Sequence, residues 1–222
     1  MTPATKVFVV DDDPSLRKGL SRLLSAAGLD VESFASARAF LDRNRDQGPA
    51  CLVVDQRMPE LSGLQLQKML LEREDTVSVV FLTGHGDVAM SVEAMKAGAV
   101  DFLAKPVEGK VLLEAVRGAL ARSAAIIDRR RDRESFLTRL ALLTPREREV
   151  AGLVAEGLLN KQIAAQLGNS EKTIKVHRAR VMQKLEVSSV AELARLAERT
   201  GALTLRTSSE AVLRALSRTP SC

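Results

Sequence analysis

Short apolar runs alternate with longer segments of helical periodicity over the first 120 residues. The apolar runs have the length and composition of buried strands and cover residues 7–10, 31–34, 51–54, 77–82 and 100–103. Between them, apolar residues recur at helical spacing, which predicts helices at residues 14–27, 37–45, 63–73, 88–97 and 108–120. This strict alternation predicts an α/β doubly wound fold, a five-stranded parallel sheet with helices on both faces.

The pattern changes after Leu120. Residues 121–141 carry no strand signal and include the charged run from Arg129 to Glu134, so we expect a helical linker that partly continues the preceding helix. Its apolar residues do not repeat as heptads, which argues against a long coiled coil. We expect the arginines of this run to form a solvated face, with contact to a DNA backbone as the alternative.

Residues 142–200 predict an all-α domain of four helices. Thr144 and Glu147 form a capping box with a proline at the first helical position, which marks the start of the first helix. The helices are predicted at residues 145–156, 160–167, 171–185 and from Ser189 onward. The second and third are joined by a short turn at Gly168, which is typical of a helix-turn-helix motif. The tail, residues 201–222, is expected to be disordered, with a dimer-stabilising segment as the alternative.

Length and charge support this division into two domains. A chain of 222 residues exceeds the usual size of one domain. Residues 1–120 hold 14 Lys and Arg against 17 Asp and Glu, a net charge of −3, whereas residues 121–222 hold 19 against 11, a net charge of +8. An acidic first part and a basic second part favour a cation or phosphoryl site followed by a polyanion-binding domain.

Three sequence features bear on the cellular location. No apolar run approaches the ~18 residues of a membrane span, and the first apolar run is too short for the core of a signal peptide. The two cysteines, Cys51 and Cys222, form no disulfide framework or metal-ligand cluster. We therefore expect a cytoplasmic protein without a membrane partner.

Acidic and cationic residues follow the predicted strands at their carboxyl ends, where open parallel sheets bind ligands. Asp11 and Asp12 follow the first strand, Asp55 the third, Thr83 the fourth and Lys105 the fifth. If the first and third strands are neighbours, the carboxylates face one small volume. They would then repel one another unless a cation joins them, and oxygen ligands at a partly open site suit Mg²⁺. An aspartate nucleophile, a metal and a lysine suit phosphoryl transfer.

Residues 6–120 resemble the receiver domain of two-component response regulators, which has a flavodoxin-like fold. The matching motifs are Val9-Val10-Asp11-Asp12, Asp55-x-Arg57-Met58-Pro59-x-x-x-Gly63, Thr83-Gly84 and Lys105-Pro106. The resemblance implies that Asp55 accepts a phosphoryl group from the phosphohistidine of a sensor histidine kinase. It also implies that Asp12, Asp55 and the backbone carbonyl of Arg57 bind Mg²⁺ directly, and that Asp11 binds it through water.

The same resemblance assigns a switch. Thr83 and Lys105 would contact the acyl phosphate, Phe102 would be the aromatic switch residue, and the bond between Lys105 and Pro106 would be cis. Two residues next to these motifs are not expected to take part in the phosphoryl site. Asp13 precedes a proline at the first helical position and is expected to cap a helix, and His85 is expected to be a surface loop residue.

Residues 142–199 resemble the LuxR-type four-helix output domain, and the domain order resembles the FixJ/NarL class. The motifs are Leu143-Thr144-Pro145-Arg146-Glu147-Arg148-Glu149-Val150, Gly157-x-x-Asn160-Lys161-Gln162-Ile163-Ala164 and Lys172-Thr173-Ile174-Lys175-Val176-His177. By resemblance, Lys175 and Val176 enter the major groove. Phosphates would be held mainly by Lys172, Thr173, Arg178 and Lys184, and the same surface would include His177 and Arg180. Two residues depart from the family pattern: Asn169 stands where relatives usually have an apolar turn residue, and Ala179 replaces a base-reading lysine that some members have.

These features predict a phosphorylation-dependent transcriptional regulator rather than an enzyme, with a sensor kinase, double-stranded DNA and a second copy of itself as partners. One alternative is an Mg²⁺-dependent aspartyl-phosphate phosphatase. That class has a D-x-D-x-T run after the first strand, whereas this chain has Asp11-Asp12-Asp13-Pro14. Another is an adaptor with an RNA-binding output. The absence of Tyr and Trp disfavours the aromatic platforms that bind single strands.

Overall fold

The computed structural model describes residues 5–44, 48–84 and 88–203 and divides into two compact units, Met1–Arg129 and Arg130–Cys222. Two of the predictions above concern residues outside the described ranges, namely the surface position of His85 and the disorder of the tail from residue 204 onward.

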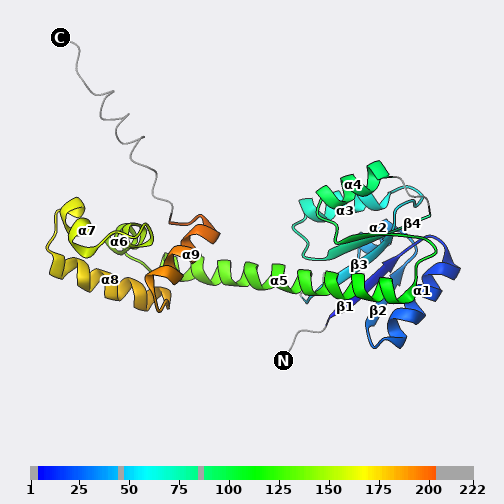
Figure 1. Cartoon of the computed structure of the whole chain (residues 1–222), viewed down its shortest axis with the longest axis horizontal. Helices are drawn as coiled ribbons and strands as arrows, with labels where there is room; N and C mark the ends of the chain where they lie inside the picture. The colour runs from blue at the N-terminus through cyan, green and yellow to red at the C-terminus, as the bar shows by residue number, and fades with distance from the viewer. Residues whose placement is uncertain (1–4, 45–47, 85–87, 204–222) are drawn as a thin grey trace, which may run out of the picture. The chain divides into compact units, whose positions relative to one another are not determined.

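The first unit is built on a five-stranded parallel sheet, as predicted (Figure 1). The strands are β1 (Lys6–Val10), β2 (Asp30–Phe34), β3 (Ala50–Asp55), β4 (Ser78–Thr83) and β5 (Asp101–Ala104). Their order in the sheet is β2-β1-β3-β4-β5, so β1 and β3 are hydrogen-bonded neighbours, with Val10 opposite Val54. The carboxyl ends of these two strands therefore lie side by side.

Helices cover both faces of this sheet (Figure 1). They are α1 (Pro14–Ala26), α2 (Ala37–Leu41), α3 (Gly63–Glu72), α4 (Val88–Lys96) and the first part of α5 (Gly109–Ala141). One buried cluster joins alternate strand residues such as Phe8 to α2, α3 and α4, and another joins the intervening residues such as Val9 to α1 and α5. This alternation follows from the two-residue period of a strand, which sends successive side chains to opposite faces.

Two helices of this unit end more than one residue away from the prediction. α2 ends at Leu41 rather than at residue 45, because Arg43 turns back onto it. The guanidinium of Arg43 lies 3.7 Å from the ring centroid of Phe40, donates to the Phe40 carbonyl at 3.0 Å and pairs with Asp75 at 3.4 Å. α5 does not end at residue 120 but continues through the expected helical linker to Ala141, since no glycine or proline interrupts residues 119–141.

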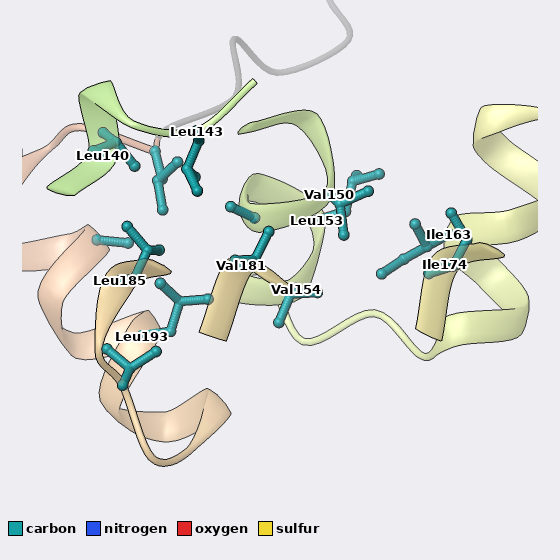
Figure 2. Close-up of a cluster of buried hydrophobic side chains, with 14 of the residues drawn as sticks. Leu140, Leu143, Val150, Leu153, Val154, Ile163, Ile174, Val181, Leu185 and Leu193 are labelled. Carbon is teal, nitrogen blue, oxygen red and sulfur yellow. The ribbon is translucent and has the colours of Figure 1, made fainter. Parts of the chain in front are cut away.

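The second unit is all-helical over its described residues, which end at residue 203, and these residues share a hydrophobic core (Figure 2). Its further helices are α6 (Pro145–Ala155), α7 (Asn160–Leu167), α8 (Glu171–Leu185) and α9 (Val190–Thr200). The core begins before residue 142, where we expected the domain to start, because Phe136 and Leu140 from the end of α5 are buried in it. They are four residues apart and so lie on one face of the helix.

A buried carboxylate ties α6 to α8 within this unit. Glu147 forms the predicted capping box with Thr144, and its Oε2 atom also accepts a hydrogen bond from Lys184 Nζ at 2.7 Å. The bond from Lys184, followed by that from the Thr144 backbone, holds the pKa of Glu147 down to about 2, from an ordinary value of 4.5. The ionised form of Glu147 therefore stabilises the folded unit.

This pKa predicts an acid-dependent loss of stability. Because the pKa of Glu147 is lower in the folded state, its contribution is present above about pH 4.5 and is lost as the pH falls toward about 2. The advantage of the wild type over Glu147→Gln should therefore shrink across this window. Urea unfolding at pH 6, 4 and 2.5, followed through amide resonances of α6 and α8, measures it. An advantage that does not change with pH would contradict the role given to the charge.

Candidate functional site

Three carboxylates gather at the carboxyl edge of the sheet. Asp11 and Asp12 follow β1, and Asp55 is the last residue of β3. Because β1 and β3 are neighbours, one ligand oxygen of each of the three residues can be chosen so that all lie within 4.8 Å of one another. Asp11 is buried, Asp55 is partly buried and Asp12 is exposed, so the cluster opens to solvent on one side.

A lysine from the end of β5 completes the cluster. Lys105 Nζ lies 2.8 Å from an Asp11 carboxylate oxygen and 3.2 Å from one of Asp55. Its backbone N–H donates to the carbonyl of Thr83 at the end of β4, and the Lys105–Pro106 peptide bond is cis, as the resemblance implied. The sequence prediction that Asp11, Asp12, Asp55 and Lys105 converge is thus confirmed by the geometry.

Burial and charge act on the pKa values of this cluster in opposite directions. Burial raises the pKa of Asp55 above its ordinary value, although the charge and hydrogen bond of Lys105 oppose this. Burial alone would lower the pKa of Lys105, but its bonds to the two carboxylates more than offset that and raise it. Lys105 is therefore held as an ammonium beside Asp55 at neutral pH, where it can face an anionic group.

The oxygen donors of this cluster fit Mg²⁺. The ion takes oxygen ligands at about 2.1 Å, so its ligands lie roughly 3 to 4 Å apart, and it usually keeps several waters. A group of three carboxylates within 4.8 Å accommodates this with small rotations or one bridging water. Arg57 approaches Asp55 through its backbone N–H, which is 3.4 Å from Asp55 Oδ1. The role of the Arg57 carbonyl stays a prediction.

Asp13, the third acid of the run, caps α1 instead. Its side chain accepts hydrogen bonds from the backbone N–H groups of Ser15 at 2.8 Å and Leu16 at 3.3 Å. It lies outside the cluster of three carboxylates found among the described residues. The prediction that Asp13 is a helix cap is confirmed.

The start of α3 comes very close to Asp55. A Cβ atom on Gly63 would lie 2.7 Å from the carbonyl oxygen of Asp55 and 2.9 Å from the ring of Phe81. Only glycine allows this approach without displacement of the chain. Gly63, which the motif includes, therefore sets how tightly the loop after β3 folds over the sheet.

The two predicted switch residues lie on the neighbouring strands. Thr83 is buried at the end of β4. Phe102, on β5, is half-buried, and its ring centroid lies 5.8 Å from that of Phe81. Thr83 is thus on the strand next to β3, and Phe102 is on the strand after that. Their roles as a switch remain predictions.

One residue at this site was missed by the sequence reasoning. Arg17, on α1, donates a hydrogen bond from Nη1 to the main-chain carbonyl of Asp11 at 2.7 Å and lies 3.5 Å from that of Asp12. A basic residue on an amphipathic helix gives no signal of its own. The only clue was its place one turn after the acidic run.

The second set of predicted site residues lies on α8. Ile174, Val181 and Leu185 face the core, whereas Thr173, expected to contact a phosphate, is half-buried and pairs its hydroxyl with that of Ser170. The exposed side chains of the helix include three cationic residues and one large apolar residue, Val176, which is 47% exposed. The exposed cations on α8 are Lys172, Lys175 and Arg180.

Three other predicted contacts on α8 are less accessible. Lys184 is bound to the buried Glu147, and Arg178 donates to Asn160 Oδ1 on α7 at 3.0 Å. His177 is half-buried, and its Nδ1 atom has no hydrogen-bond partner among the described residues. Lys184 and Arg178 thus hold helices together within the unit, which the sequence alone did not indicate.

The turn between α7 and α8 accommodates its unusual asparagine. Gly168 adopts a left-handed conformation, with φ of +63°. The backbone N–H of Asn169 then donates to the carbonyl of Ala164 at 3.0 Å, and its side-chain amide donates to that of Leu167 at 3.1 Å. Asn169 therefore satisfies carbonyls at the end of α7 by hydrogen bonds, where an apolar residue would use packing.

Comparison with known families identifies both units. The model of the response regulator receiver domain matches residues 7–117, and that of bacterial regulatory proteins of the luxR family matches residues 141–197. Within the part of the chain that the structure describes, no helix is long and apolar enough to cross a membrane.

Individual relatives cover nearly the whole chain. Nodulation protein W of Bradyrhizobium diazoefficiens is 44% identical over 88% of this chain and 86% of its own length. The transcriptional regulatory protein FixJ of Azorhizobium caulinodans is 44% identical over 89% of this chain and 93% of its own length. Among solved structures, the response regulator StyR is 46% identical, with a TM-score of 0.73 over 88% of this chain and 99% of that chain. The chain therefore belongs to the two-component response regulators that join a receiver domain to a LuxR-type helix-turn-helix DNA-binding domain, in the class of FixJ.

Proposed function

We propose that this protein accepts a phosphoryl group on Asp55 from a sensor histidine kinase, dimerises as a result and then binds promoter DNA. The observation that carries the proposal is the cluster at the carboxyl edge of the sheet, where Asp55 lies beside two further carboxylates and within 3.2 Å of Lys105 Nζ. A carboxylate so placed is a nucleophile with a cation ready beside the incoming phosphoryl oxygens.

In the proposed transfer, a carboxylate oxygen of Asp55 forms a bond to phosphorus while the phosphorus–nitrogen bond of the phosphohistidine breaks. Lys105 would move from the Asp55 carboxylate to a phosphoryl oxygen, a short shift because it already spans Asp11 and Asp55. Thr83, at the end of the adjacent strand β4, would then donate its hydroxyl to another phosphoryl oxygen. Asp11, Asp12 and Asp55, with the Arg57 carbonyl, would hold Mg²⁺. When bound, this ion neutralises phosphoryl oxygens and aligns the transferred group.

For the DNA contact, we propose the exposed side of α8. Lys175 and Val176 are both exposed and would enter the major groove, while Lys172 and Arg180 would hold phosphates. Lys184 is left out of this surface because its ammonium is bound to Glu147. Arg178, His177 and Thr173, which are half-buried, would make at most peripheral contacts. We place the start of the DNA-binding domain at residue 130, because α5 supplies part of its core.

The proposed function predicts a coupled response to phosphorylation. A dimer binds two half-sites at once, so its affinity rises through effective concentration without any new DNA contact. Acetyl phosphate or beryllofluoride with Mg²⁺ should therefore shift the protein from monomer toward dimer and raise its operator affinity by roughly 10- to 100-fold. Both responses should vanish in Asp55→Asn and weaken in Thr83→Ala. Sedimentation velocity alongside DNA titration measures them. Tighter binding by a protein that stays monomeric on DNA would refute the dimer mechanism.

The surface of α8 predicts a division between residues that read bases and residues that hold phosphates. A good base contact favours the correct base over a wrong one by about 1–3 kcal/mol. Loss of a phosphate contact instead weakens binding to all DNA sequences and makes that binding less dependent on salt. Lys175→Ala should thus lower operator binding more than binding to random duplex, and Lys172→Ala should lower both equally. Lys172 is a better comparison than Arg178, which also supports α7. Titrations at several salt concentrations test this, and equal behaviour of the two variants would rule it out.

A further inference from the structure

We propose that Arg17 is a positioning residue for the Mg²⁺ site, an inference that rests on the proposed phosphoryl-acceptor function. Arg17 lies in the first turn of α1, four residues after the N-cap Asp13. Its Nη1 atom lies 2.7 Å from the carbonyl oxygen of Asp11 and 3.5 Å from that of Asp12. The guanidinium thus contacts the backbone of two of the three residues whose carboxylates form the cluster.

The contact fixes a segment that would otherwise have few restraints. Residues 11–13 connect β1 to α1 and belong to neither element. The backbone N–H of Asp13 donates to the Asp11 carboxylate at 2.9 Å, and the backbone N–H of Asp11 donates to the carbonyl of Phe34 at 3.4 Å. Arg17 adds a hydrogen bond to the carbonyl of Asp11. Because its donor is charged, this bond is stronger than one from a neutral donor. With the backbone held, less freedom is lost when the carboxylates bind a cation.

Arg17 differs from Lys105 in what it touches. Lys105 binds carboxylate oxygens, which are the atoms a metal would use. The Arg17 guanidinium donates to main-chain carbonyls of the same segment, so it can orient Asp11 and Asp12 without occupying their ligand atoms. Support of ligands by residues behind them is a general property of metal sites, and its loss weakens metal binding.

Positioning and simple electrostatics predict opposite effects of removing this side chain. A positive charge near a divalent cation repels it, so removal of the charge alone would tighten Mg²⁺ binding. Loss of the tether would instead free the segment and weaken Mg²⁺ binding. The sign of the change therefore distinguishes the two, and a neighbouring cation provides the matched control. Lys18, the next residue on α1, is exposed and carries the same charge.

The test is an Mg²⁺ titration of the full-length protein, followed through amide chemical shifts of residues near β1 and β3; at 24.1 kDa the chain is within reach of this method. Arg17→Gln should weaken Mg²⁺ binding by about 3- to 10-fold. Arg17→Lys, which keeps the charge and one donor, should recover part of the loss. Lys18→Gln should bind Mg²⁺ as tightly as the wild type or slightly more tightly.

The outcomes separate this inference from the proposed function. If the wild type binds Mg²⁺ and incorporates phosphate from acetyl phosphate, but Arg17→Gln binds Mg²⁺ equally or more tightly, the positioning role is overturned while the function stands. If the wild type does neither, both fall together. Thermal unfolding of each variant reports whether the fold is intact. Should Arg17→Gln not fold, Arg17→Lys carries the test, since equal or tighter Mg²⁺ binding by that variant overturns the role.

Discussion

Replacement of Asp55 by asparagine is expected to abolish the incorporation of phosphate from acetyl phosphate in the presence of Mg²⁺. An amide has no anionic oxygen to attack phosphorus, and it also removes one ligand from the carboxylate cluster. The fold should survive, because asparagine has nearly the same shape and Asp55 lies at the end of its strand. Base-labile phosphate on the intact protein, quantified by mass spectrometry or phosphate-affinity gels, measures the result.

Asp13→Asn is the matched control for this experiment. It makes the same chemical change in the same acidic edge, but Asp13 caps α1 and asparagine caps a helix about as well as aspartate. Its labelling should therefore stay close to that of the wild type. Equal labelling of the wild type and Asp55→Asn would exclude Asp55 as the acceptor, whereas loss of labelling in both variants would extend the site to Asp13.

A fragment that begins at residue 142 is expected to be largely unfolded, whereas one that begins at residue 130 should fold. The shorter fragment lacks Phe136 and Leu140, both buried in the core of the second unit. Figure 2 shows Leu140 in this core. Truncation of a buried Phe or Leu costs about 3–5 or 2–5 kcal/mol, against a total stability of about 5–15 kcal/mol for a domain. The shorter fragment also loses the carbonyl of Leu140, which accepts from Arg148 at 3.1 Å.

Circular dichroism, urea unfolding and the dispersion of amide resonances compare the two fragments. Within the longer fragment, Phe136→Ala should lower the free energy of unfolding by about 3–5 kcal/mol. Leu137→Ala should lower it by under about 1 kcal/mol, because Leu137 is 38% exposed. These neighbours on one helix make a matched pair. A residue 142 fragment as stable as the longer one would show that α5 adds nothing to this core.

Elements whose signals are local were predicted closely. α7 and α8 begin and end at the expected residues, because each has a helical period between a cap and a turn: Ser170 before α8, Gly168 after α7. The strands β1 to β5 were placed to within one residue at each end, since apolar runs between acids and glycines leave little choice. The family motifs also pointed to Asp55 and Lys105 before any geometry was known.

Contacts between residues far apart in the chain decided features that the sequence pattern did not show. The early end of α2 depends on Arg43 packing on Phe40 and Asp75, and a sequence window around the helix does not contain Asp75. Lys184, to which the resemblance assigned a phosphate contact, binds Glu147, 37 residues earlier in the chain, and its role at DNA stays a prediction. Neither partner can be read from periodicity, which reports only the face on which a residue lies.

The sequence by itself determined the succession of strands and helices along the chain, the division into an acidic and a basic part, and the identity of the acids at the strand ends. Only the tertiary structure decided that β1 lies beside β3, which brings Asp11 to Asp55 across 44 positions of the chain. It also decided that Arg17 holds the backbone of Asp11. The reason is physical: hydrophobic periodicity and capping act within one or two turns of chain, whereas a binding site is built from side chains that only the packing of distant elements brings together.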